Sequence, residues 1–188
     1  MAEKIFYFFN CLLDGVQFSV IMYVNFIFVG VFIGYAFGSA PIIGYNYGAG
    51  NHPEMKNVFK KSIIFNIFAG ILMFIAAYLL SGFLSNIFVG YDAVLFSMTQ
   101  RGFIIYSISF LVMGLNIYAS SFFTALGNGF ISALISFLRT LFFQIICVLV
   151  LPLIWELDGI WMAIVVAEGM ALIVSFVLLA KNKKKYGY

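Results

Sequence analysis

The sequence predicts an all-α integral membrane protein with about five transmembrane helices. Hydrophobic residues make up 64% of the 188 residues, charged residues make up 9%, and the mean hydropathy is +1.11. Soluble domains are about 45–50% apolar and about 25% charged, so this chain lacks the polar surface that water requires. Its uncharged runs also exceed the roughly 20 residues that cross a bilayer, and they are continuous. Continuous apolar runs favour helices over the alternating strands of a β-barrel.

Glycine, proline and charged residues divide the apolar sequence into spans. The five expected spans cover about residues 15–40, 58–83, 102–126, 131–151 and 159–180. Pro41 is expected to end or kink the first span, Gly127-Asn128-Gly129 to end the third, and Pro152 to end the fourth.

The spans define three expected regions of the chain. Residues 1–14 are expected to be the external stub of a preceding helix, and residues 15–180 to form the five-helix transmembrane bundle. Residues 181–188 are expected to form a basic cytoplasmic tail.

The distribution of Lys and Arg predicts the orientation. Alternate loops and the tail place eight basic residues on one side: Lys56, Lys60, Lys61, Arg139, Lys181, Lys183, Lys184 and Lys185. The other side has two, Lys4 and Arg101. Basic residues accumulate on the cytoplasmic side, so we expect a multi-pass protein of the cell (plasma) membrane with a cytoplasmic C-terminus. The lysine tail is typical of a membrane anchor in contact with the lipid bilayer, and we expect no nucleic-acid partner.

The sequence lacks the motifs of soluble enzymes. His52 is the single histidine, and Cys11 and Cys147 stand in apolar surroundings without a ligand spacing. No phosphate-binding loop is present. We therefore expect no enzyme activity, no metal site and no organic cofactor.

Two groups of residues in the first span indicate special helix geometry. Gly30, Gly34 and Gly38 share one helix face, which suits either tight packing or a sliding or hinge surface. Pro41 is followed by Gly44 and Gly48. This pattern fits either a broken helix that lines a cavity or a helix that ends at the membrane surface.

Four segments resemble the multidrug and toxic compound extrusion (MATE) family, in the family's order. They are Pro41–Asn51, Ser121-Phe-Phe-Thr-Ala-Leu-Gly-Asn128, Ser136-Phe-Leu-Arg139 and Asp158–Gly169. The resemblance implies twelve helices in two lobes, alternating access, and export of cationic or amphipathic drugs in exchange for H⁺ or Na⁺. The five spans would then be helices eight to twelve, a partial second lobe that needs the missing N-terminal lobe.

The sequence departs from the family at the acidic positions. Many members have an ion-coupling acidic residue in the first lobe, and some have one in the tenth helix. Residues 102–126 contain none, which argues against Na⁺ coupling at that position. Two alternative functions remain open: a non-transporting truncated remnant or accessory membrane subunit, and a lipid-linked sugar flippase of the same superfamily.

Glu168 is the one acidic residue inside an expected span. It lies nine positions into the last span, roughly 12 Å from the outer end, and Arg139 lies at a similar depth from the other side. A charge at this depth is paired, protonated or faces a polar cavity. We expect an Arg139–Glu168 pair that either couples ion movement to transport or fastens two helices. Snorkelling of Arg139 to the cytoplasmic interface is the alternative.

Several other polar or amphipathic residues within or beside the spans are candidates for the substrate cavity. They are Asn25, Tyr45, Asn46, Asn116, Ser120 and Gln144, and Tyr118 lies in the same part of the third span as Asn116. Bridging between helices is the competing role for each of them.

Overall fold

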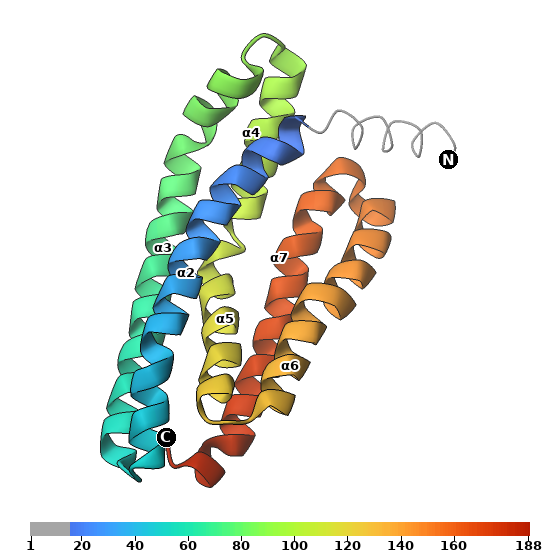
Figure 1. Ribbon diagram of the computed structural model, residues 1–188. Helices are drawn as coiled ribbons and strands as arrows, with labels where there is room; N and C mark the ends of the chain where they lie inside the picture. The colour runs from blue at the N-terminus through green and yellow to red at the C-terminus, as the bar shows by residue number, and fades with distance from the viewer. Residues whose placement is uncertain (1–15) are drawn as a thin grey trace.

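The computed structural model describes residues 16–188, and the side chains from residue 19 onward. All the described elements are helices, and they pack into an elongated bundle (Figure 1). The helices are α2 (Val16–Gly48), α3 (His52–Val89), α4 (Ala93–Ser107), α5 (Phe110–Ala125), α6 (Gly129–Phe137), the π-helix η1 (Leu138–Phe143) and α7 (Gln144–Tyr186). The external stub expected at residues 1–14 lies outside the described residues.

Helices long and apolar enough to cross a membrane account for most of the described chain. Three stretches qualify by length and composition, namely Ser19–Gly48, His52–Val89 and Gly129–Tyr186. The bent pair α4 and α5 is a fourth candidate. The third stretch reverses direction at Trp155 and Glu156, so it contributes two antiparallel arms (Figure 1). The arrangement agrees with the expected fold class of about five spans.

The first two spans are longer than expected. Pro41 neither ends nor interrupts α2, which continues to Gly48. In an apolar environment a continuous helix keeps the remaining backbone groups hydrogen-bonded, and the loss of one N–H at proline is tolerated. Helix α3 begins at His52, where the Asn51 side chain accepts a hydrogen bond from the Glu54 N–H. Its first turn and a half therefore include Lys56, which the expected boundary at residue 58 left outside.

The third span is broken, which the sequence did not indicate. It begins at Ala93, because the Asp92 carboxylate caps the helix by accepting hydrogen bonds from two backbone N–H groups. Helices α4 and α5 meet at an angle of 46°. At this break α3 approaches very closely: a Cβ added to Gly70 would lie 2.8 Å from the Phe110 carbonyl oxygen. The glycine permits this backbone contact.

The last two spans form a hairpin that turns later than expected. Pro152 lies inside the helix, and the reversal occurs at Glu156, whose φ of 51° is the left-handed region. Gly159 packs against the first arm, since an added Cβ would lie 2.4 Å from the Leu151 carbonyl oxygen. We call residues 129–154 the first arm and residues 157–186 the second arm. Small residues of the second arm, Ala163, Ala167 and Ala171, pack with Phe143 and Cys147 between the arms.

The residues after position 180 are not a separate tail. The second arm stays helical to Tyr186, so the expected boundary at residue 181 falls within α7. Tyr186 and Tyr188 are buried in an aromatic cluster with Tyr118, Phe122 and Phe123 of α5. The lysines of this segment therefore sit on a docked helix end, close to the start of α3.

Candidate functional site

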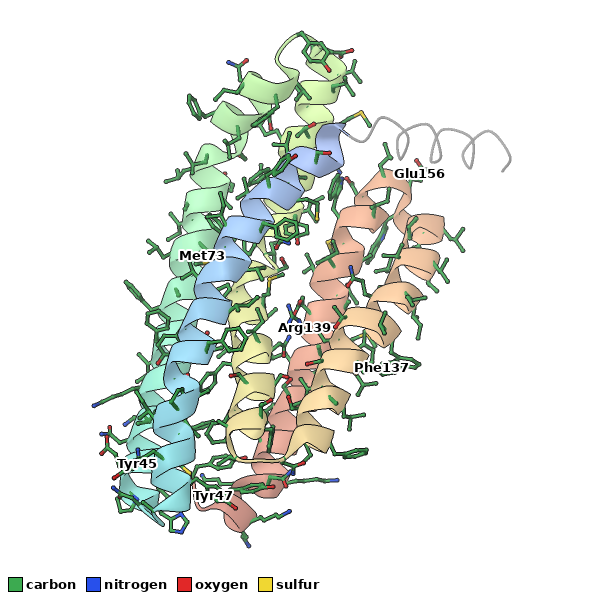
Figure 2. All side chains as sticks on the ribbon, viewed as in Figure 1. Tyr45, Tyr47, Met73, Phe137, Arg139 and Glu156 are labelled. Atoms are coloured by element: carbon green, nitrogen blue, oxygen red, sulfur yellow. The ribbon has the colours of Figure 1, made fainter. Side chains whose placement is uncertain are left out.

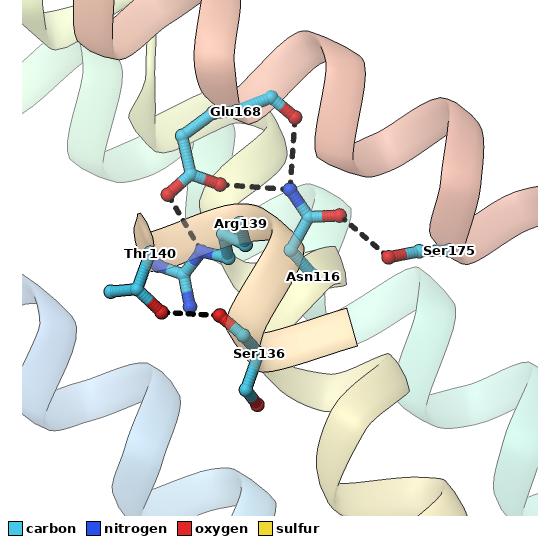
Figure 3. Close-up of polar contacts among 6 residues, drawn as sticks. All are labelled: Asn116, Ser136, Arg139, Thr140, Glu168 and Ser175. Carbon is cyan, nitrogen blue, oxygen red and sulfur yellow. Dashed lines mark hydrogen bonds and ion pairs between the residues drawn. The ribbon is translucent and has the colours of Figure 1, made fainter. Parts of the chain in front are cut away.

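Glu168 lies in the interior of the bundle and is paired with Arg139. The residue is 6% exposed. The Arg139 Nε–H donates to the Glu168 Oε1 at 2.7 Å, which joins the two arms (Figure 3). Arg139 lies about midway along the bundle, far from Glu156 at one end and Tyr45 at the other (Figure 2). The ion pair expected from the depth of the two residues is confirmed.

Asn116 of α5 fixes the other oxygen of the same carboxylate. Its Nδ2 donates to the Glu168 Oε2 at 2.8 Å and to the Glu168 backbone carbonyl at 3.0 Å. The Ser175 hydroxyl donates to the Asn116 Oδ1 at 3.0 Å. Asn116 is fully buried, and three of its hydrogen-bonding positions are satisfied (Figure 3). Each carboxylate oxygen of Glu168 thus faces a donor, and the charge is held in place from two helices.

Arg139 is presented by an irregular segment of backbone. It belongs to η1, a six-residue π-helix between α6 and α7. A π-helix has looser backbone hydrogen bonding than an α-helix, and such segments recur at functional sites. The Arg139 side chain is 20% exposed, and within the described part of the chain only its Nε–H is hydrogen-bonded.

A row of hydroxyl groups leads from the Gly127–Gly129 turn toward this pair. Ser120 Oγ lies 2.9 Å from Ser132 Oγ and 2.8 Å from Ser136 Oγ. Thr124 Oγ1 lies 2.6 Å from Ser132 Oγ, and the Thr140 hydroxyl donates to the Ser136 carbonyl. We call these five residues the hydroxyl row. The row lies between α5 and the first arm. Ser136 is one turn before Arg139, and Figure 3 shows Ser136 and Thr140 beside the ion pair.

The other candidate residues lie apart from the polar cluster. Tyr45 is 77% exposed near the end of α2. The Asn46 Nδ2 donates to the Ile42 carbonyl of its own helix. Asn25 Oδ1 is buried without a hydrogen-bond partner among the described residues, and Gln144 is half-buried at the start of α7. Tyr118 is buried in the aromatic cluster. Of the six cavity candidates, Asn116 contacts Glu168 and Ser120 belongs to the hydroxyl row.

The glycines of α2 present an open face. No heavy atom of the described chain lies within 4 Å of a Cβ added to Gly30, Gly34, Gly38 or Gly48. Gly44 is different, because its added Cβ would lie 3.4 Å from the Ala125 carbonyl oxygen. Close packing of the Gly30, Gly34 and Gly38 face, if it occurs, therefore requires a neighbour other than residues 16–188.

Sequence reasoning missed Ser175 and most of the hydroxyl row. A signal for the row was present: Ser120 and Thr124 are four residues apart, as are Ser132, Ser136 and Thr140. This spacing places hydroxyls on one face of each helix. No comparable signal pointed to Ser175, which is one serine among apolar residues.

The sequence matches the model of a known protein family. The model named MatE matches residues 13–150, which is most of the chain. The chain belongs to the MatE family. This family comprises multidrug efflux transporters, and the resemblance noted in the four sequence segments is confirmed. The protein is accordingly a membrane transporter family member rather than an enzyme.

Solved structures of MATE transporters share the fold. An outward-facing multidrug resistance MATE transporter of the MOP superfamily aligns over 99% of this chain and 43% of its own, with a TM-score of 0.84 and 16% identity. An inward-facing MATE transporter aligns over 90% of this chain and 39% of its own, at a TM-score of 0.76 and 17% identity. The Vibrio cholerae transporter VcmN in the bent form gives a TM-score of 0.77 and 16% identity, covering 90% of this chain and 40% of that one.

The MatE chain corresponds to only part of each of these transporters. It spans less than half of the length of each transporter structure. No curated protein sequence gives a match. The fold is thus that of a partial lobe of a MATE transporter.

Proposed function

We propose that this chain is part of the second lobe of a multidrug efflux antiporter and that Glu168 is the group that couples transport to H⁺. The observation that carries the proposal is the Glu168 carboxylate, buried at mid-bundle and held by Arg139 and Asn116. Ionisable residues inside a membrane are costly to maintain, and they mark ion pathways in transporters.

Protonation of Glu168 supplies a switch between two arrangements of the arms. With the carboxylate charged, Arg139 of the first arm and Asn116 of α5 both hold the second arm. A proton on Glu168 removes the negative charge and weakens the charge-assisted bond to Arg139. The arms are then free to shift, and η1 provides the irregular backbone that accommodates the shift. By linkage, the arrangement that lacks the ion pair binds the proton more tightly.

The same geometry favours H⁺ over Na⁺. Sodium would need several oxygen ligands, whereas both oxygens of Glu168 already accept hydrogen bonds. The described residues contain no group of three or more His, Cys, Asp or Glu side chains that could hold a metal ion. In this proposal the hydroxyl row, whose members are hydrogen-bonded to one another, forms part of the route by which a proton approaches the pair from the Gly127–Gly129 end.

The exported compounds in this proposal are cationic or amphipathic drugs, which bind between this lobe and a first lobe. Substrate sites of two-lobe carriers lie at the interface of the halves. The open glycine face of α2, formed by Gly30, Gly34 and Gly38, is suited to close approach of such a partner. Transport therefore requires the first lobe, and we place the complete assembly in the plasma membrane with the C-terminus cytoplasmic.

The competing functions fit the site less well. A flippase for lipid-linked sugars needs a basic cavity deep in the bundle that can hold phosphate, but the charge of Arg139, the basic residue at that depth, is neutralised by Glu168. A non-transporting remnant predicts no effect of a first lobe. Dye accumulation in efflux-deficient bacteria separates these functions: we expect lower accumulation when this chain is co-expressed with a related transporter's first lobe, and no effect of either part alone. Unchanged accumulation on co-expression, with both parts present in the membrane, would support the remnant.

A further inference from the structure

A groove with a volume of about 590 Å³ lies between α3, α5 and α7. It is located where α3 begins and the second arm ends. Its inner wall is apolar, with Phe59 and Ile63 from α3, Leu115 from α5 and Leu172 from the second arm. The exposed lining residues, which mark its opening, include Lys56, Phe176, Ala180 and Lys183. The groove therefore combines a basic end with an apolar interior.

The dimensions of the groove match one leaflet of a bilayer. Its lining on the second arm extends from Leu172 to Lys183. Eleven residues of α-helix rise about 16 Å. Half of the hydrocarbon core of a bilayer is about 15 Å thick. A molecule with its charged end beside Lys183 would thus extend an apolar chain about as deep as an acyl chain reaches.

The charged side chains that line the groove, Lys56 and Lys183, are both positive. They come from the start of α3 and the end of α7, and none of the lining side chains is acidic. Glu54, in the first turn of α3, is acidic but does not line the groove, and its carboxylate accepts hydrogen bonds from Asn57. Further exposed lysines, Lys60 and Lys184, lie on the same helix ends. This end would repel a cationic drug and attract an anion.

We propose that the groove binds an anionic phospholipid. The phosphate lies between Lys56 and Lys183, and one acyl chain lies along Leu115, Leu172 and Leu179. The lipid would connect the start of α3 to the end of the second arm. Its chain would pass Ser175, which lines the groove and donates to Asn116, and would end near Leu172. The site does not depend on the proposed transport function, because it uses the opposite charge preference and a different part of the bundle.

Native mass spectrometry of the full chain in detergent tests the site. The protein is titrated with dioleoylphosphatidylglycerol and, separately, with dioleoylphosphatidylcholine. Each lysine beside an anionic headgroup contributes about a fivefold increase in affinity, so the wild type should prefer phosphatidylglycerol by about twentyfold. The Lys56→Gln/Lys183→Gln variant should lose this preference. The matched control, Lys60→Gln/Lys184→Gln, removes the same charge from helix ends outside the groove and should retain it.

A second variant tests the apolar part of the groove without changing charge. Leu172→Trp fills the inner end and should weaken binding of both lipids by about tenfold, while glycerol 3-phosphate should not compete with phosphatidylglycerol. Circular dichroism and the elution volume establish that each variant is folded. Equal binding of both lipids by the wild type would overturn the proposal, as would an equal loss in the two lysine variants. Effective competition by glycerol 3-phosphate would show a phosphate site rather than a lipid site.

Discussion

The Arg139 Nε lies 2.7 Å from the Glu168 Oε1, so the two arms of the C-terminal hairpin are joined by an ion pair in the interior of the bundle. The two residues are 29 positions apart in the chain. Because the reversal at Glu156 brings the arms side by side, both charges reach the same depth. The predictions below concern this pair, the contacts that support it and the helix packing around it.

Removal of either charge should destabilise the fold, and the decrease in the free energy of unfolding should differ between the two variants. Arg139→Ala leaves Glu168 buried without its partner and should cost about 3–5 kcal/mol. Glu168→Ala should cost less, because the partly exposed Arg139 can reach a more polar region. The double variant Arg139→Met/Glu168→Leu should be more stable than either single variant, because it leaves no unpaired charge in the bundle. Denaturant unfolding in detergent micelles measures all three.

The control for this series is the Arg101–Asp158 pair, which is more exposed. Arg101→Ala should cost only about 0.2–1 kcal/mol, since water screens an exposed pair. Equal effects of Arg101→Ala and Arg139→Ala would contradict the assignment of the Glu168 pair as a buried structural and functional contact.

Asn116→Ala should destabilise the fold by about 1–3 kcal/mol, because the Glu168 Oε2 and the Ser175 hydroxyl lose their partner in a buried site. Asn57→Ala is the matched control, because Asn57 is exposed and its side chain donates to the Glu54 carboxylate at the surface. The free energy of unfolding of this variant should stay within about 0.5 kcal/mol of the wild-type value. Thermal unfolding of both variants measures the difference. A neutral Asn116→Ala variant would show that Glu168 is held by Arg139 alone.

Gly70→Ala should destabilise the fold, whereas Gly30→Ala should stabilise it. An alanine at position 70 meets the Phe110 carbonyl oxygen at 2.8 Å, which is backbone that has little room to move. The resulting strain should cost about 1–3 kcal/mol. Position 30 has no neighbour within 4 Å, so alanine should stabilise α2 by up to about 1 kcal/mol through its higher helix propensity.

The same Gly30→Ala variant tests the proposed contact with a first lobe. In the co-expressed pair it should reduce dye export despite the more stable helix, because the added methyl group separates the two lobes. Unimpaired export would place the lobe contact on another face of α2.

Stability should decrease in alkaline solution through Tyr188. Burial raises the pKa of Tyr188 above its ordinary value of 10.0, since the charged phenolate is poorly solvated in the aromatic cluster. The stabilising contribution is complete below pH 10, where both states are protonated, and is lost as the pH rises from 10 toward the raised pKa of the folded state. The Tyr188→Phe variant should lose less stability than the wild type between pH 9 and about 11.5. Parallel curves for the two proteins would contradict a buried, ionisable Tyr188.

The sequence predicted the pair because depth in a bilayer can be counted along a helix. Glu168 and Arg139 were each about eight or nine residues into their spans from opposite sides, so both had to lie near the same level. The π-helix that carries Arg139 could not be predicted, since residues 138–143 have no unusual composition. Asn116 was indistinguishable from the other polar candidates until the fold placed it beside Glu168.

The boundaries of the helices were predicted less well, for physical reasons that differ between sites. Pro41 was expected to end or kink its span and Pro152 to end one, but in an apolar environment each is accommodated within a helix. The hairpin instead turns at Glu156, an acidic residue with a left-handed backbone conformation that has no sequence signature. The docked end of α7 depends on Tyr186 and Tyr188, whose aromatic partners are distant in the sequence.

The most direct test of the central claim is dye export by this chain co-expressed with a first lobe, in wild-type form and as Glu168→Gln. Glutamine keeps the size of the side chain but cannot exchange a proton. The exposed Glu54→Gln variant controls for the loss of one carboxylate. We predict that Glu168→Gln abolishes the export driven by a proton gradient while Glu54→Gln leaves it unchanged. Full export by Glu168→Gln would contradict the assignment of Glu168 as the coupling group.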